Sequence, residues 1–398
     1  MANSTARIGI LGGGFGGLYT ALRLQALDWG SDRPPEIVLI DQRDRFVFSP
    51  LLYELLTDEL QTWEIAPPYE ELLANTLIQF RKAQVTGVDV AQQTVHFADQ
   101  PPLNCDRLVL ALGGQTLLTD TPGVKNHALP FGRLEDAYQL LARLRQLEQS
   151  EQDAIRVAIV GGGYSGVELA CKLSDRLGAR GRLRIIEQGT EILRRSPEFN
   201  QKTAQAALSE RQVWLDLETT VAAIGPDTIS LNYRDQIDEI PVDLVLWTVG
   251  TQVSDLIQDL PLPKTEQGKL HTTATLQVVE HPDLFALGDL AVCTGQESLP
   301  ATAQVAIQQA DYCAWNIWAS LCDRPLLPFQ YQPLGEMLSL GTDTATLAGL
   351  GLELQGPIAH LTRRLIYLSR LPTLEHQLAV GVNWLTKPLL NWLGEGVA

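Results

Sequence analysis

Two stretches of the chain share one pattern of apolar and glycine positions. Residues 7–24 read RIGILGGGFGGLYTALRL, residues 156–173 read RVAIVGGGYSGVELACKL, and the two align without a gap. Each pattern predicts a short buried strand, a glycine-rich turn and the first turns of an amphipathic helix. A repeat with so long a period indicates duplicated domains, because the units of a solenoid are much shorter.

The chain continues in the same way after each copy. The apolar runs EIVLID and RLRIIE end in Asp41 and Glu187, and the later runs RLVLALGG (107–114) and DLVLWTVG (243–250) both end in glycine. Such runs are typical of strands buried in a parallel sheet. The polar, alternating stretches near 80–98 and 213–233 predict antiparallel strand pairs. At HPDLFALGDLA (281–291) we expect the chain to return to the first domain, which makes the second domain an insertion.

The first glycine motif, G-x-G-x-x-G, is formed by Gly12, Gly14 and Gly17. It follows a predicted strand and opens a predicted helix, which is the context of a dinucleotide site, and a plain tight turn is the alternative. Gly12 allows the tight turn, Gly14 lets the backbone approach a pyrophosphate, and Gly17 permits close packing of helix on strand. The helix N-terminus offers N–H groups to phosphate, and Asp41 is placed to accept hydrogen bonds from ribose hydroxyls.

The second motif repeats these features with Gly161, Gly163, Gly166 and the acid Glu187. Two such sites imply two dinucleotides, and the pair that supplies redox chemistry is a bound FAD and a visiting NADH or NADPH. Glu187 favours NADH, because a carboxylate suits two free ribose hydroxyls and repels a 2′-phosphate. NADPH stays open, since several arginines are close in the sequence: Arg182, Arg184, Arg194 and Arg195.

These patterns predict an α/β fold with two Rossmann-like domains, the second inserted in the first, followed by a C-terminal region with an amphipathic helix. We expect an FAD-binding domain over residues 1–120 and 265–325 and an NAD(P)H-binding domain over residues 121–264. Residues 326–398 form the C-terminal region, which is rich in Leu, Gly and Trp.

Length and composition agree with this organisation. The 398 residues suffice for two or three domains, and 45% hydrophobic with 19% charged residues is ordinary for a globular protein. The net charge of −17 repels nucleic acid, so we expect no DNA or RNA partner. The start of the chain is interpreted as lacking a signal peptide, and no run of 18 or more apolar residues occurs that could span a membrane.

The cysteines, at positions 105, 171, 293, 313 and 322, include no C-x-x-C pair. An odd and scattered set argues against a disulfide framework and favours a reducing compartment. No metal site is predicted.

Several motifs together resemble one family. LGGGFGG, FSPLLYELL (48–56), VGGGYSGVELA (160–170), FALGDLA (285–291) and AQVAIQQADY (303–312) stand in the order and spacing of the flavoproteins with two dinucleotide-binding domains, and the chain is most similar to the type II NADH dehydrogenases. The resemblance covers nearly the whole chain. It implies an FAD-dependent NAD(P)H:quinone oxidoreductase that does not pump protons, with a lipid quinone as electron acceptor.

The resemblance implies roles for individual residues. Beside the first motif and Asp41, the implied FAD contacts are Phe15, Gly16, Gln42, Val85, Ala111, Gly113, Asp289, Ala303 and Gln304. Beside the second motif and Glu187, the implied NAD(P)H contacts are Tyr164, Ser165 and Gly250. Pro50 and Leu51 are similar to residues near the flavin, and a purely structural role is the alternative. For Asp289 the alternative is a cap on the following helix.

Three residues receive catalytic roles from the resemblance. Glu168 corresponds to a family glutamate implicated in proton delivery, and quinone reduction takes up two protons as well as two electrons. A solvated helix face is the alternative. Gln304 and Gln308 lie at the start of a helix that in similar proteins faces the flavin and the quinone, where backbone N–H groups stabilise negative charge. A polar helix face is again the alternative.

The segment HQLAVGVNWLTKPLLNWLGEGVA (376–398) predicts an amphipathic helix. Its apolar positions recur at helical spacing: Leu378, Val382, Leu385, Leu389 and then Trp392 or Leu393. Trp384 and Trp392 suit a membrane interface, Lys387 can extend its charge to the surface, and Pro388 is expected to break or kink the helix.

We interpret this helix as a peripheral anchor that admits a lipid quinone, with packing on the core or on a second subunit as alternatives. Upstream, Arg363, Arg364 and Arg370 add basic charge to an otherwise acidic chain.

Within this family, the stretch DQRDRFVFSPLLYELLTDELQTWEIAPPYEELL is most similar to the cyanobacterial and chloroplast branch. Members of that branch act as demethylphylloquinone reductases in phylloquinone biosynthesis, which implies a naphthoquinone acceptor. The implied location is the cytoplasmic face of a membrane, which in a cyanobacterium is the thylakoid or plasma membrane. A respiratory role on plastoquinone or menaquinone and a homodimeric assembly stay open. The cysteine positions disfavour a sulfide:quinone reductase and a disulfide reductase, and a non-enzymatic NAD(H)-responsive redox sensor is a further alternative.

Overall fold

The structure, a computed structural model, describes residues 5–30, 34–297 and 299–395, with side chains described as far as residue 386. It divides into two compact units. The first contains Met1–Phe48, Ala66–Gln115 and Gln252–Gln332, and the second contains Ser49–Ile65, Thr116–Thr251 and Pro333–Ala398. In comparison with the expected boundaries, residues 49–65 and the C-terminal region both group with the second unit.

The first unit is built on an eight-stranded sheet in which the five strands from one edge inward are parallel. The order β3-β2-β1-β7-β20 is that of a doubly wound dinucleotide-binding sheet, and β19, β18 and β21 extend it. The parallel strands are β1 (Arg7–Leu11), β2 (Glu36–Asp41), β3 (Gln79–Lys82), β7 (Arg107–Leu110) and β20 (His281–Ala286). The extension consists of β18 (Leu270–Thr272), β19 (Gln277–Val278) and β21 (Ala291–Cys293).

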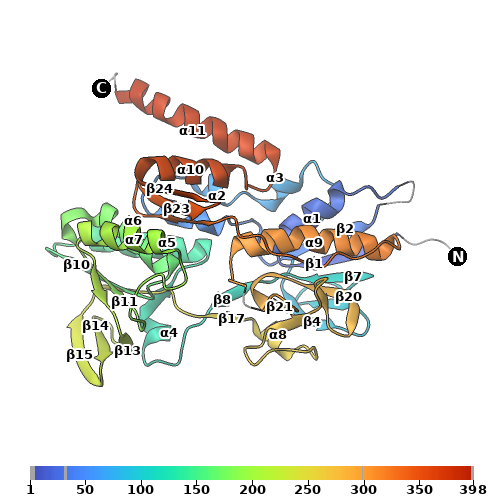
Figure 1. Cartoon of the computed structure of the whole chain (residues 1–398), viewed down its shortest axis with the longest axis horizontal. Helices are drawn as coiled ribbons and strands as arrows, with labels where there is room; N and C mark the ends of the chain where they lie inside the picture. The colour runs from blue at the N-terminus through green and yellow to red at the C-terminus, as the bar shows by residue number, and fades with distance from the viewer. Residues whose placement is uncertain (1–4, 31–33, 298, 396–398) are drawn as a thin grey trace. The chain divides into compact units, whose positions relative to one another are not determined.

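Two helices of the first unit lie side by side over this sheet (Figure 1). Helix α1 (Phe15–Ala26) begins directly after the first glycine-rich turn and packs against α9 (Ala303–Leu321). The other elements of the unit are α3 (Tyr69–Leu73), α8 (Asp255–Asp259), η3 (Gly288–Leu290), β4 (Val85–Asp89), β5 (Thr94–Phe97) and β6 (Leu103–Asn104). The short strands β8 (Gly114–Thr116) and β17 (Thr251–Val253) lie where the chain passes between the units.

The second unit repeats the same design. Its parallel sheet has the order β12-β11-β10-β16-β9, again with the strand before the glycine-rich turn in the middle. The strands are β9 (Ala128–Pro130), β10 (Ile155–Val160), β11 (Gly181–Ile186), β12 (Trp214–Asp216) and β16 (Leu244–Trp247). Helix α6 (Tyr164–Leu177) contacts β10, β11 and α7 (Glu198–Glu210).

Further elements complete this unit. A three-stranded antiparallel sheet contains β13 (Thr219–Ile224), β14 (Thr228–Tyr233) and β15 (Gln236–Pro241). The remaining helical elements before the C-terminal region are η1 (Ser49–Leu55), α2 (Thr62–Ile65), α4 (Val124–His127), α5 (Leu134–Gln149) and η2 (Gly178–Arg180).

The C-terminal region adds a small sheet and two helices to the second unit. Its elements are β22 (Glu336–Ser339), β23 (Ala345–Gly349), β24 (Leu352–Gln355), α10 (Gly356–Leu368) and α11 (Leu374–Glu395). Helix α10 packs on β23, and α11 leads away above α10 (Figure 1). Pro388 was expected to break or kink α11, and a break is ruled out because the helix continues through this position. A proline removes one backbone hydrogen bond, a loss that a long helix can tolerate.

The apolar runs became buried strands, as predicted. Ile8 and Ile10 of β1 are fully buried, and so are Ile159 of β10 and Leu246 of β16. The fold prediction, two Rossmann-like domains with a C-terminal helix, is confirmed.

One detail of the strand predictions is wrong. β4 pairs with β5, and β13 with β14, as antiparallel strands, as expected for most of the two polar stretches. However, β3 and β12, at the start of those stretches, run parallel to β2 and β11. Both lie at the edge of their sheets and expose part of their residues, so their sequences read as polar.

Candidate functional site

The first glycine motif forms the turn between β1 and α1. Gly12 has a φ of +100°, and a Cβ on Gly17 would lie 1.8 Å from the Gly12 carbonyl oxygen, so both positions require glycine. A Cβ on Gly14 would meet nothing within 4 Å, and Gly14 contributes no side-chain cap to α1. The first turn of α1 therefore presents backbone N–H groups above open space, which fits a dinucleotide pyrophosphate.

Asp41, at the end of β2, holds this turn together. Its carboxylate accepts hydrogen bonds from the backbone N–H of Gly13 (2.8 Å) and of Arg43 (2.9 Å), and it is almost fully buried. The Tyr69 hydroxyl donates to the Gly13 carbonyl over 2.8 Å. Tyr69 had no signal in the sequence, because it comes from a distant helix. A ribose would have to share the Asp41 carboxylate with these amides, and Gln42 beside it is exposed.

Other implied FAD contacts are distributed over the same unit. Phe15 lies in an aromatic cluster, with ring centroids 5.2 Å from Phe46 and 5.3 Å from Phe48. A Cβ on Gly16 would contact Leu287, and Ala111 follows β7 near the same turn. Gly113 has a φ of +66°, and Val85 begins β4.

Asp289 lies in η3 and lines a small cleft, together with Lys269, Gln296 and Thr302. The alternative that it caps the following helix is wrong, because η3 is followed by strand β21. Burial raises the pKa of Asp289, against the opposing effects of Lys269 and of the Gly114 N–H. Thr302, the residue that caps α9, lines the same cleft, so Asp289 and the start of α9 face one space.

The two glutamines predicted as catalytic have partners inside the first unit. The side-chain amide oxygen of Gln304 accepts a hydrogen bond from the Tyr331 hydroxyl (2.6 Å). The side-chain amide of Gln308 donates one hydrogen bond to the backbone of Gln332 and accepts another from it. These contacts attach the segment after α9 to the helix. Near Ala303 the N-terminal backbone of α9 is the part of this helix best suited to face an anion.

The second glycine motif has the same geometry as the first. Gly161 has a φ of +112°, a Cβ on Gly166 would lie 1.9 Å from the Gly161 oxygen, and a Cβ on Gly163 would meet nothing within 4 Å. Glu187 accepts hydrogen bonds from the N–H groups of Gly162 and Gly189, each over 2.7 Å. The two halves of the chain thus match in their acids and amides as well as in their glycines.

The remaining NAD(P)H candidates surround this second turn. The Ser196 hydroxyl donates to the Tyr164 hydroxyl over 2.8 Å, and Ser165 accepts from the Tyr53 hydroxyl over 2.9 Å. Gly250 follows β16 with a φ of +79°.

The four nearby arginines fall into two pairs. Arg184 forms an ion pair with Asp216 (2.9 Å), and Arg182 donates to backbone carbonyls. Arg194 and Arg195 are exposed, so they are the better candidates to reach a 2′-phosphate.

Glu168 does not lie on a solvated helix face. It is 7% exposed, accepts a hydrogen bond from the Ser339 N–H (2.8 Å) and lies 3.6 Å from the Arg363 guanidinium. Burial raises its pKa to about 7, against the opposing Arg363 charge and Ser339 hydrogen bond. A carboxyl group with this pKa can hold or release a proton at neutral pH.

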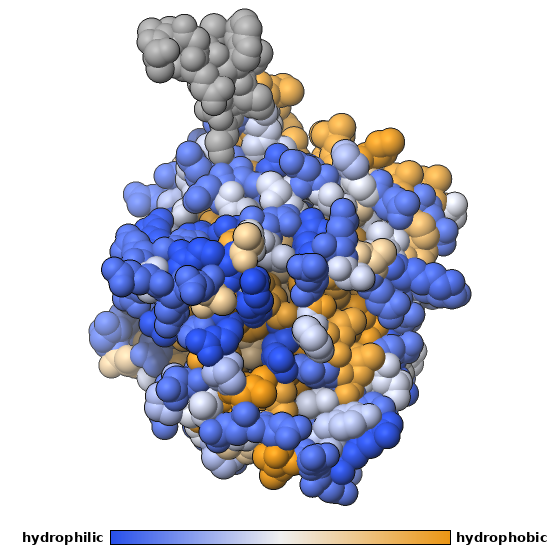
Figure 2. All heavy atoms as spheres, turned by 90° about the vertical axis from the view of Figure 1, so that its left-hand side faces the viewer, coloured by the Kyte–Doolittle hydropathy of each residue, from blue (hydrophilic) through white to orange (hydrophobic). Residues whose placement is uncertain are grey.

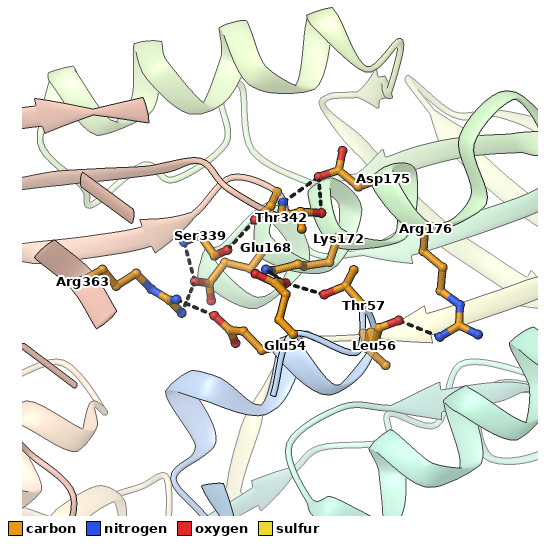
Figure 3. A network of polar contacts seen from close by, with 12 residues as sticks. Glu54, Leu56, Thr57, Glu168, Lys172, Asp175, Arg176, Ser339, Thr342 and Arg363 are labelled. Carbon is orange, nitrogen blue, oxygen red and sulfur yellow. Dashed lines mark hydrogen bonds and ion pairs between the residues drawn. The ribbon is translucent and has the colours of Figure 1, made fainter. Parts of the chain in front are cut away.

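Arg363, one of the three arginines that add basic charge upstream of the C-terminal helix, does not lie on the surface. It is fully buried, and Figure 3 shows it directed toward Glu54 and Glu168. Its Nη1 lies 2.5 Å from the Glu54 carboxylate, and its Nη2 donates to the Pro50 carbonyl over 2.8 Å. Leu51, beside Pro50, is fully buried, so within the second unit both residues have structural roles.

Lys172 and Glu59 extend the cluster of charged side chains formed by Glu54, Glu168 and Arg363. Lys172, one turn after Glu168 on α6, is fully buried and donates to the carboxylate of Glu59. Glu54, Glu59 and Lys172 were not identified from the sequence, because nothing local distinguishes them from exposed charges.

The cysteines are free thiols in the structure. Burial raises the pKa of Cys105 to about 11 and of Cys171 to about 12, so these two groups are protonated and unreactive at neutral pH. Among the described residues, no group of three or more His, Cys, Asp and Glu side chains could hold a metal ion.

Helix α11 is attached to the second unit through Glu64 of α2. The buried Glu64 carboxylate accepts from the Trp384 indole N–H (2.7 Å) and from Asn383 (3.1 Å), and its carbonyl lies 2.9 Å from Nε2 of His376. Trp384 also lies under the Arg364 guanidinium. The indole predicted for a membrane interface therefore has a polar partner within the protein.

The outer sides of α10 and α11 carry exposed apolar side chains: Ile358, Leu361, Leu365, Leu374, Leu378, Val382 and Leu385. We call these residues the C-terminal apolar face. Figure 2 shows apolar atoms gathered at the upper right of that view. The side chains of Lys387, Pro388, Leu389, Trp392 and Leu393 lie outside the described residues. In the part of the chain that the structure describes, no helix is both long and apolar enough to cross a bilayer.

Comparisons with known proteins place the chain in a family. The model of the pyridine nucleotide-disulphide oxidoreductases matches residues 6–310. The chain is 60% identical to demethylphylloquinone reductase NdbB of Synechocystis sp., covering 99% of both chains. It is 42% identical to the alternative NAD(P)H-ubiquinone oxidoreductase C1 of Arabidopsis thaliana, covering 98% of this chain and 82% of the relative.

Solved structures agree on the fold. NDH2 from Plasmodium falciparum in complex with NADH superposes with a TM-score of 0.85 at 17% identity, over 97% of this chain and 98% of that one. Family and fold together bear out the prediction of FAD and NAD(P)H as cofactors. The chain therefore belongs to the pyridine nucleotide-disulphide oxidoreductase family and, within it, to the NAD(P)H:quinone oxidoreductases of type II.

Proposed function

We propose that this enzyme uses NAD(P)H to reduce a naphthoquinone of the demethylphylloquinone type. The observation that carries the proposal is the 60% identity, over 99% of both chains, to a demethylphylloquinone reductase. FAD, when bound, supplies the chemistry that links a two-electron donor to a quinone. The open spaces above Gly14 and Gly163 are where the two pyrophosphates would lie.

The preferred nucleotide in this proposal is NADH. Glu187 is fixed by two backbone amides at the end of β11, so its charge cannot easily turn away from a ribose. A 2′-phosphate there would meet a fixed carboxylate, which costs binding energy. NADPH would be accepted only as far as Arg194 or Arg195 compensates for that charge.

We assign the supply of one proton to Glu168. Quinone reduction requires two protons, and Glu168 is a buried carboxyl whose pKa of about 7 lets it carry one at neutral pH. Gln304 and Gln308 are proposed as positioning residues for the start of α9, because their amides hold the segment at Tyr331 and Gln332.

The C-terminal apolar face is the proposed contact with the membrane surface. Seven apolar side chains lie outward on two neighbouring helices, which is more than scattered surface leucines would give. The attachment of α11 to Glu64 keeps its apolar side outward, as a helix lying in the membrane interface requires. The enzyme would thus be a peripheral protein that meets its lipid quinone at the bilayer. Association into a homodimer through this face stays a prediction.

Two other acceptors remain as alternatives. A respiratory role is favoured by the type II NADH:quinone oxidoreductases of staphylococci, one of which, from Staphylococcus saprophyticus, is 24% identical over 92% of this chain. Sulfide oxidation is disfavoured, because it needs reactive cysteines and burial raises the pKa of both Cys105 and Cys171.

A comparison of quinones tests the proposed substrate. The purified enzyme would be assayed with NADH and with naphthoquinones that carry or lack the ring methyl group, beside a plastoquinone analogue, in liposomes. We expect the highest kcat/KM for the unmethylated naphthoquinone. A higher value for the plastoquinone analogue would favour the respiratory role, and the absence of turnover with any quinone would favour a redox sensor.

A further inference from the structure

Arg363 is the largest fully buried side chain in the described part of the molecule. It comes from α10, the helix whose other side carries part of the C-terminal apolar face. Its guanidinium lies between two carboxylates, 2.5 Å from Glu54 of η1 and 3.6 Å from Glu168 of α6 (Figure 3). One buried guanidinium thus interacts with two buried carboxyl groups.

The two carboxylates share the cation unequally. Burial opposes the ionisation of Glu54, but the charges of Arg363 and Lys172 and the hydrogen bonds to its carboxylate together outweigh burial and lower the pKa of Glu54 below its usual value. Glu168 is farther from the guanidinium, and there burial outweighs the same charge. Glu54 is therefore the anion that Arg363 neutralises, and Glu168 is the group left able to take up a proton.

We propose that Arg363 and Glu54 are positioning residues that set the proton occupancy of Glu168. The guanidinium and the Ser339 N–H fix one oxygen of the Glu168 carboxyl, while Glu54 takes most of the positive charge. Without Glu54, the Arg363 charge would keep Glu168 ionised. Without the Arg363 guanidinium, no positive charge would balance the Glu168 carboxylate after it has lost its proton. This inference rests on the proposed reduction of quinone.

Titratable groups from three helical elements interact directly with Glu168: Tyr53 and Glu54 from η1, Tyr164, Cys171 and Lys172 from α6, and Arg363 and Tyr367 from α10. Glu336 of β22 and His360 of α10 interact with members of this set. Burial lowers the pKa of His360 to about 4 and raises that of Cys171 to about 12, so neither titrates near neutral pH. Glu54 and Arg363 are therefore the charges whose removal should affect Glu168 most.

The proton balance of the proposal is simple. A quinone takes up two electrons from the nucleotide and two protons to become a quinol. Glu168 breaks its O–H bond and gives one of these protons, and the second is the proton of the hydride that carries the electron pair from the nucleotide. The resulting carboxylate is balanced by Arg363 and then takes a proton from water, which restores the starting state.

Two substitutions should shift the pH profile of quinone reduction in opposite directions. Glu54→Gln removes the competing anion, so Arg363 stabilises ionised Glu168 and the fall in rate should move about one pH unit lower. Arg363→Lys replaces the guanidinium by a single ammonium group that stays with Glu54, so the rate should fall at a higher pH than in the wild type. Arg176→Lys is the matched control, because Arg176 lies on α6, the helix of Glu168, but pairs with Glu148, and this substitution should leave the pH profile unchanged.

A second readout is independent of turnover. The infrared band of a protonated carboxyl would be titrated in the holoenzyme, and Glu168→Gln would identify the band that belongs to Glu168. We expect the band to disappear at lower pH in Glu54→Gln than in the wild type. If wild-type enzyme reduces quinone but both substitutions leave the profile and the band unchanged, the inference is wrong. If wild-type enzyme does not reduce quinone at all, the proposed function itself fails. Should Glu54→Gln not fold, the upward shift in Arg363→Lys decides alone.

Discussion

Replacing Gly163 and Gly166 by alanine, one at a time, separates a phosphate-binding turn from a plain tight turn. The two glycines lie three residues apart in one motif but have different surroundings. An alanine Cβ at 166 would lie 1.9 Å from the Gly161 oxygen, whereas one at 163 would meet nothing within 4 Å. Gly163 has a φ of −80° and a ψ of −169°, an extended conformation that alanine adopts without strain.

The expected magnitudes follow from these distances. Gly166→Ala must push α6 away from the turn until the contact is no longer forbidden, which should cost at least about 3 kcal/mol and lower the melting temperature by about 5 °C or more. Gly163→Ala should change stability by less than about 0.5 kcal/mol. Its methyl group would occupy the space for the pyrophosphate, so the Kd for NAD⁺ should rise at least about tenfold, or about 1.4 kcal/mol.

Thermal unfolding and calorimetric titration with NAD⁺ measure both quantities on the same samples. Gly14→Ala and Gly17→Ala, the equivalent pair of the first unit, should show the same contrast with FAD retention as the readout. The reasoning fails if Gly163→Ala binds the nucleotide as the wild type does, or if it loses as much stability as Gly166→Ala.

Three further predictions concern the acceptor side, the membrane and the nucleotide. Glu168→Gln should slow quinone reduction at least about tenfold at pH 6 and leave flavin reduction by NADH unchanged, and stopped-flow absorbance separates these two half-reactions. In the wild type, the rate of quinone reduction should fall as the pH rises through about 7, because Glu168 loses its proton there. Leu378→Glu and Leu385→Glu should each lower partitioning onto phospholipid vesicles by about tenfold or more in a co-sedimentation assay, whereas Ile237→Glu, a substitution at a similarly exposed residue of β15, should not. Glu187→Gln should reduce the preference for NADH over NADPH by about tenfold in kcat/KM, whereas the control Glu191→Gln should not change it. An unchanged ratio in Glu187→Gln would show that Glu187 does not select the nucleotide.

The local sequence predicted the glycine-rich turns and the parallel sheets well. Gly12, Gly17, Gly161 and Gly166 stand in short patterns whose neighbours in sequence are also their neighbours in space, so strand, turn and helix could be deduced together. The edge strands β3 and β12 were misjudged because an edge position in a sheet leaves no mark in the local pattern.

The contacts within the buried charge cluster could not be predicted from local sequence. Arg363 and Glu54 are separated by 309 positions in the chain, and each is next to ordinary helical sequence. The sequence showed Arg363 only as one of three basic residues upstream of the C-terminal helix, and nothing local indicated that it is fully buried. Glu168 could be proposed from family resemblance, but the residues that set its proton occupancy could be found only from the tertiary structure.

One measurement tests the central claim, that this chain carries two electrons from a nicotinamide nucleotide to a quinone through FAD. The purified protein, held without oxygen, would be titrated first with NADH and then with a naphthoquinone while the flavin absorbance band is recorded. We predict that NADH bleaches the band at one equivalent and that the quinone restores it. A band that NADH does not bleach, or a reduced band that no quinone restores, would contradict the account.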